Sequence, residues 1–192
     1  VGGPRVVDAW DLLGEGLPAG RRVAVVGGGA VGLDVALALA VRGTLDPETL
    51  AFLVFHGAEA DGRLHELVEK GTSEITVIEM LPKAGADLGR SSRWVVMVEL
   101  ERRGVRIMTS CEVTSIGEDG TVSYGRRLAD GSREEASSRF DTVVLALGSV
   151  PRDPLSASLE AAGLAVTRVG DCVKPARIID AIHQGHRAAR AL

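Results

Sequence analysis

The stretch that decides the fold is RRVAVVGGGAVGLDVALALAVRG, residues 21–43. A short β-branched run over residues 22–27 predicts a fully buried parallel strand. Residues 30–42 are apolar on nearly every side and rich in alanine, which predicts a helix that packs closely against a sheet. Three consecutive glycines, Gly27–Gly29, stand where the strand passes into the helix, and their role decides what the fold is for.

These glycines match a known nucleotide-binding pattern. The order of strand, Gly27-x-Gly29-x-x-Gly32 and helix is the dinucleotide-binding fingerprint in the context it requires. Gly27 permits the tight turn, Gly29 lets a pyrophosphate approach the backbone, and Gly32 lets the helix press against the strand. The pyrophosphate then lies at the helix N-terminus, where free N–H groups favour anions. Gly28 is not required, so alanine or cysteine would serve there. The alternative is a glycine-rich turn without a ligand.

The second requirement of the fingerprint is a carboxylate at the end of the next strand, where it accepts hydrogen bonds from ribose hydroxyls. Residues 74–80 predict that strand, and Glu79 stands near its end, later in the chain than the usual spacing of about 20 residues. An insertion over residues 43–73 accounts for the delay. Glu79 would repel a 2′-phosphate, which favours NADH over NADPH, whereas the nearby Lys83 weakens that preference. The alternative for Glu79 is a solvated carboxylate at a strand end.

The composition argues against several other classes of protein. The 192 residues carry a net charge of −4 and only 3% aromatic side chains, which disfavours nucleic-acid binding. No apolar run approaches the roughly 20 residues of a membrane helix. Cys111 and Cys172 form no metal or redox motif, so we expect a reduced, cytoplasmic protein. His183 and His186 lie three apart without a third ligand, and we assign no metal site to them.

The rest of the chain completes an α/β pattern. Residues 91–103 predict a helix capped by Ser91 or Ser92. The periodicity changes to alternation over residues 111–147, which predicts an antiparallel meander followed by one more buried strand. Residues 164–171 predict a further strand that ends in a turn, followed by a final helix. The expected fold is therefore α/β: a Rossmann-like parallel sheet with helices on both faces plus an antiparallel β-meander.

A nucleotide fold with a meander after its third strand resembles the NAD domain of the two-dinucleotide-binding-domain flavoproteins. The segment DTVVLALGSVPR, residues 141–152, is similar to the family's strand ending in A-x-G-x-x-P, with Gly148 as its glycine. That motif marks the crossing from the NAD domain back to the FAD domain. The segment LAVTRVGDC, residues 164–172, resembles the family's second FAD motif. The resemblance implies that Asp171 bonds a flavin ribityl hydroxyl.

Two more segments, together with the long insertion, resemble a narrower group. EMLPKAGADLGRSSRW, residues 79–94, and GDCVKPARIIDAIHQGHRAA, residues 170–189, are similar to the C-terminal third of the old-yellow-enzyme-type oxidoreductases. These include 2,4-dienoyl-CoA reductase, enoate reductase and trimethylamine dehydrogenase. In that family a barrel holds FMN, a 4Fe–4S cluster follows, and an FAD/NAD(P) module supplies electrons. The resemblance implies that hydride passes from NADH to FAD, and electrons pass on to FMN and an enone or enoyl-type substrate.

The resemblance also implies a domain organisation. Residues 1–19 would be a linker from the FAD domain, residues 20–150 the NAD(H)-binding domain with its insertion 43–73, and residues 151–192 the returning FAD-domain segment. The sequence has no second GxGxxG and no cysteine cluster. We therefore expect a chain cut from a longer protein, with FMN and 4Fe–4S outside it and the remaining FAD, iron–sulfur and barrel domains as its partners. The fragment alone is not expected to turn over.

Two other functions stay open. The first is a non-catalytic module that holds ADP or NAD structurally or as a sensor. The second, on a weaker argument, is a stand-alone NAD dehydrogenase. No residue is assigned to catalysis or to a metal. The residues assigned to cofactor binding are Gly27, Gly28, Gly29, Ala30, Val31, Gly32, Glu79, Met80, Lys83, Gly148 and Asp171.

Overall fold

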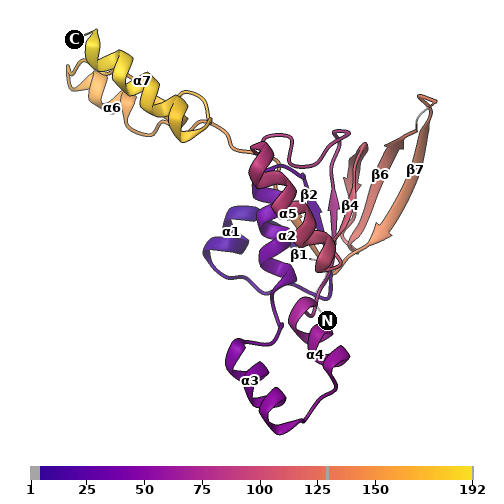
Figure 1. Cartoon of the computed structure of the whole chain (residues 1–192). Helices are drawn as coiled ribbons and strands as arrows, with labels where there is room; N and C mark the ends of the chain where they lie inside the picture. The colour runs from indigo at the N-terminus through magenta and orange to yellow at the C-terminus, as the bar shows by residue number, and fades with distance from the viewer. Residues whose placement is uncertain (1–4, 129, 192) are drawn as a thin grey trace. The chain divides into compact units, whose positions relative to one another are not determined.

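The computed structural model describes residues 5–128 and 130–191, and the chain divides into two compact units, Val1–Leu147 and Gly148–Leu192. A parallel sheet with the strand order β1-β8-β2-β3-β4 organises the first unit (Figure 1). Its strands are β1 (Arg5–Asp8), β2 (Arg22–Val26), β3 (Glu74–Ile78), β4 (Arg106–Met108) and β8 (Thr142–Leu145).

A separate antiparallel sheet follows β4 in the chain. It consists of β5 (Cys111–Ile116), β6 (Thr121–Arg127) and β7 (Arg133–Arg139) in the order β5-β6-β7. The register shifts between Val113 and Ser115, as in a β-bulge. The α/β class, with a Rossmann-like parallel sheet and an antiparallel meander, is thereby confirmed.

Helices complete both units. The first unit contains α1 (Ala9–Gly14), α2 (Ala30–Ala40) and α5 (Arg90–Arg102), and its insertion folds as α3 (Pro47–His56) and α4 (Asp61–Glu69). The second unit contains α6 (Ser156–Ala161), a 3₁₀ turn (Gly170–Cys172) and α7 (Ile178–Arg190). Within the described residues, no helix is both long enough and apolar enough to cross a membrane.

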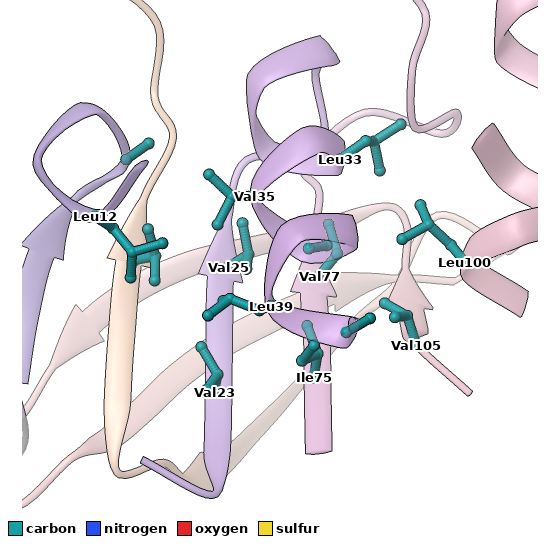
Figure 2. Close-up of a cluster of buried hydrophobic side chains, with 14 of the residues drawn as sticks. Leu12, Val23, Val25, Leu33, Val35, Leu39, Ile75, Val77, Leu100 and Val105 are labelled. Atoms are coloured by element: carbon teal, nitrogen blue, oxygen red, sulfur yellow. The ribbon is translucent and has the colours of Figure 1, made fainter. Parts of the chain in front are cut away.

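Two apolar clusters cover the two faces of the parallel sheet. Val23 and Val25 pack with α1, α2 and α5 on one face, around side chains such as Leu39 (Figure 2). Their neighbours in β2, Ala24 and Val26, point the opposite way because successive strand residues face opposite sides. That second cluster is filled from the meander. The expectation of helices on both faces therefore holds for one face only, since the second face is covered by the antiparallel sheet.

The start of the chain differs from the expected linker over residues 1–19. Residues Arg5–Asp8 form β1, which pairs in parallel with β8, and Val6 lies opposite Val143. In α1, the next element, Leu12 is fully buried. A four-residue strand is too short to show a periodicity, and its partner lies far along the chain. Local pattern could not reveal this pairing.

Two smaller expectations are wrong. The N-cap of α5 is Gly89, which supplies no side-chain bond, in place of Ser91 or Ser92. Residues 164–169 form no strand in the described part of the second unit. The reason is that a strand needs a neighbouring strand to receive its backbone hydrogen bonds, and the described elements of that unit are all helical.

Candidate functional site

The glycine turn between β2 and α2 is shaped by two close backbone approaches. Gly27 has φ +103°, and a Cβ atom there would overlap the carbonyl oxygen of Ala146. A Cβ atom on Gly32 would overlap the carbonyl oxygen of Gly27 itself. Both positions therefore require glycine. The turn lies at the carboxyl end of the parallel strands, which is where open α/β sheets bind ligands.

The Glu79 side chain links the end of β3 to this turn through a hydrogen bond. Its Oε2 accepts a hydrogen bond of 2.6 Å from the Gly28 N–H, and its Oε1 accepts one of 2.7 Å from the Leu81 N–H. The residue is only 7% exposed. Each carboxylate oxygen has a second lone pair, so each can still accept from one more donor, such as a ribose hydroxyl. Glu79 is therefore not a freely solvated carboxylate at a strand end.

Gly28 is more constrained than the fingerprint indicates. A Cβ atom at this position would lie 3.0 Å from Glu79 Cβ and 3.1 Å from Glu79 Oε2. The sequence pattern allowed alanine or cysteine here, but either would press on the buried carboxylate. The tightness arises because Glu79 folds back to accept the Gly28 N–H, a contact that the spacing of the motif does not contain.

A cavity of about 390 Å³ connects the turn with the meander. It is lined by Gly27 and Gly29, by Glu79 and Met80, and by apolar side chains from β5 and the end of β8. Cys111 forms part of this wall, and burial raises the pKa of its thiol. Sites for small organic ligands are usually cavities that are mostly apolar and contain a few polar groups.

The N-terminus of α2 is bonded to Asp87, a residue that no sequence pattern indicated. The Ala30 N–H donates to both carboxylate oxygens of Asp87, at 3.1 and 2.9 Å. Asp87 lies on the loop after β3, and neither the glycine pattern nor the strand-end rule points to that position. Only the folding of this loop onto the turn brings it into the site.

The other assigned residues are more exposed. Met80 is 64% exposed at the rim of the cavity, Lys83 is exposed, and Val31 is half-buried on α2. Asp34, two residues after Gly32, is exposed on α2.

Gly148 and Asp171 belong to the second unit. Asp171 is exposed, and its Oδ1 accepts from the Ala176 N–H at 3.3 Å. The glycine turn fits a dinucleotide because its glycines place no side chain of their own over the N-terminus of α2, where the Asp87 carboxylate accepts from the Ala30 N–H.

A larger cavity, of about 480 Å³, lies at the opposite, amino ends of β2, β3 and β4. Its lining is basic, with Arg22 and Arg106 among the residues, and it contains none of the assigned site residues. Ligands of parallel α/β sheets bind at the carboxyl ends of the strands, so we place the site at the glycine turn. Residues 5–128 and 130–191 contain no group of three or more His, Cys, Asp or Glu side chains that could hold a metal ion.

Comparison with known families agrees with this geometry. Residues 4–184 match the family described as pyridine nucleotide-disulphide oxidoreductase. The chain belongs to this family. Membership implies binding of a pyridine nucleotide and of FAD.

Two curated relatives and one solved structure illustrate the similarity. A metal reductase of Desulforamulus reducens is 38% identical over 97% of this chain and 27% of its own length. An NADH oxidase of Thermoanaerobacter brockii is 29% identical over 96% of this chain and 24% of its own length. Histamine dehydrogenase from Rhizobium sp. 4-9 has the same fold, with a TM-score of 0.67 at 20% identity over 98% of this chain and 25% of that one. The chain thus spans about a quarter of the length of these oxidoreductases.

Proposed function

We propose that this chain is the NADH-binding module of a larger flavin oxidoreductase. The observation that carries the proposal is the hydrogen bond of 2.6 Å between the Gly28 N–H and Glu79 Oε2, which joins the two halves of the dinucleotide fingerprint beside a cavity. The pyrophosphate would lie over Gly29 and Ala30, and the adenosine ribose would donate to Glu79. Met80 and Val31 would flank the ligand.

The preference for NADH over NADPH follows from the position of Glu79. A 2′-phosphate would replace the hydroxyl that donates to this carboxylate and would place two negative groups together in a buried site. A third cavity, beside Met80 and Leu81, is lined by Arg127 and Arg133. The Arg133 guanidinium already pairs with Glu112 at 3.1 Å and Glu135 at 2.6 Å. Lys83 and Arg127 are two cations that could oppose the preference.

The larger assembly belongs to the same proposal. The reduced nicotinamide would supply a hydride to FAD held mainly outside this chain. Electrons would then pass through a 4Fe–4S cluster to FMN, and the substrate would be an enone or enoyl-type compound. Residues 20–150 would form the NAD(H)-binding domain, extended by β1 and α1. Residues 151–192, which include Asp171, would be the returning FAD-domain segment, and Gly148 lies just before it. The roughly fourfold greater length of the curated relatives supports a multidomain context.

Titration of the chain with NADH, NADPH and ADP tests the proposal. Binding can be followed by the fluorescence of the reduced nicotinamide and by calorimetry for ADP. We expect NADH to bind more tightly than NADPH and ADP. Equal affinity for ADP and NADH would support the alternative of a structural or sensing site that reads only the adenosine half, and no binding of any nucleotide would contradict both functions.

A matched pair of glycine substitutions sharpens the test. Gly29→Ala adds one methyl group at ordinary negative φ, with its nearest neighbour Asp87 Oδ2 at 3.3 Å, so it should obstruct the pyrophosphate while leaving the fold intact. Gly62→Ala, in α4 with nothing within 4 Å, is the control. We expect NADH affinity to fall about tenfold or more in the first variant only, since a misplaced atom at a close backbone approach removes contacts that a ligand needs.

A further inference from the structure

The N-terminus of α2 already carries a negative charge. The N-cap, Gly29, has no side chain to cap the helix, and the Ala30 N–H is instead bonded to both oxygens of the Asp87 carboxylate. Asp87 Oδ2 also lies 3.3 Å from the point where a Cβ of Gly29 would be. The carboxylate therefore covers the side of Gly29 that the absence of a side chain leaves open to a pyrophosphate.

The loop that carries Asp87 is held beside the glycine turn by its backbone. The Gly85 N–H donates to the Gly28 carbonyl oxygen at 2.7 Å, and Arg93 Nε donates to the Ala84 carbonyl oxygen at 2.8 Å. Ala84 is only 1% exposed. Asp87 itself is exposed, so its side chain can rotate into solvent without moving this anchored backbone.

We propose that Asp87 determines the affinity and selectivity of the anion position, because its carboxylate must turn away before a pyrophosphate can bind the Ala30 N–H. This inference rests on the proposed dinucleotide site. A free phosphate or pyrophosphate would only exchange one anion for another at the helix N-terminus, with little net gain. A whole dinucleotide also gains contacts at Glu79 and in the cavity, and these offset the displacement of Asp87. Asp87 thus selects dinucleotides against free phosphates.

Asp87→Asn is the variant that tests this role. Asparagine keeps an oxygen that can accept from the Ala30 N–H, so the helix stays capped, but it removes the charge. We expect inorganic pyrophosphate to bind about five- to tenfold more tightly to the variant than to the wild type, and NADH to bind more tightly by a smaller factor. Glu59→Gln removes one charge at an exposed position in the insertion and should change neither affinity.

The outcomes separate this inference from the proposed function. If wild-type protein binds NADH but Asp87→Asn binds pyrophosphate and NADH no more tightly, Asp87 is only a helix cap and the inference is overturned. If neither protein binds NADH, the proposed function fails and the inference fails with it.

A measurement on the wild type avoids any dependence on the variant. Saturation with NADH should shift the amide resonance of Ala30 in a ¹⁵N–¹H spectrum and the carboxyl resonance of Asp87 in a ¹³C spectrum, because their hydrogen bond is exchanged for one to the ligand. Inorganic pyrophosphate at the same concentration should shift them much less. NADH binding that leaves both resonances in place would show that Asp87 is not displaced.

Discussion

The packing of α1 gives a quantitative prediction about the edge of the parallel sheet. Leu12 and Leu13 are consecutive residues of this helix, but Leu12 is fully buried and Leu13 is 40% exposed. Leu12→Ala removes three carbon atoms, which at about 0.8 kcal/mol each is about 2.4 kcal/mol of lost burial. The cavity left behind raises the cost to about 3–4 kcal/mol. Leu13→Ala should cost under about 1 kcal/mol because that side chain is partly solvated.

Urea unfolding measures both costs. Both tryptophans, Trp10 and Trp94, lie in the first unit, so their fluorescence reports its unfolding alone. With a slope of about 2 kcal/mol per molar urea, the Leu12→Ala midpoint should fall by about 1.5–2 M, and the Leu13→Ala midpoint by under about 0.5 M. Equal shifts in the two variants would mean that β1 and α1 are a loose linker after all.

Two further predictions concern individual titrating groups. Hydrogen bonds from the Thr49 N–H and hydroxyl hold the pKa of Asp46 below its ordinary value of 3.8, so its stabilising effect is present above that value and is lost as the pH falls through the lower, folded-state pKa. The difference in stability between wild type and Asp46→Asn, measured from about pH 2 to 6, should therefore shrink at the acid end, and a constant difference would contradict the cap. Cys111 is 1% exposed and burial raises the pKa of its thiol, whereas Cys172 is partly exposed, so a thiol reagent should modify Cys172 first and Cys111 only on unfolding. Equal rates in the native protein would place Cys111 outside the core.

The candidate site was predictable only where a residue carries a local signal, either a glycine spacing or a place at the end of a strand. Gly27, Gly29 and Gly32 could be predicted because the strand, turn and helix are consecutive. The φ angle at Gly27 and the close backbone approaches at Gly27 and Gly32 agree with the glycine pattern. Glu79 could be assigned from its place at a strand end despite the insertion. Asp87 could not, since its contact with Ala30 depends on how a loop folds over the turn 57 positions away.

The sequence by itself determined the buried strand β2, the glycine turn, the close-packing helix α2 and the alternating meander, because each depends on a periodicity or a backbone requirement within a few residues. Tertiary structure alone decided that β1 adds to the sheet beside β8, that the meander covers the second face, and that a side chain on Gly28 would press on Glu79. These features depend on contacts between segments far apart in the chain. Such contacts form only when burial of both partners stabilises them together, and no local pattern records that pairing.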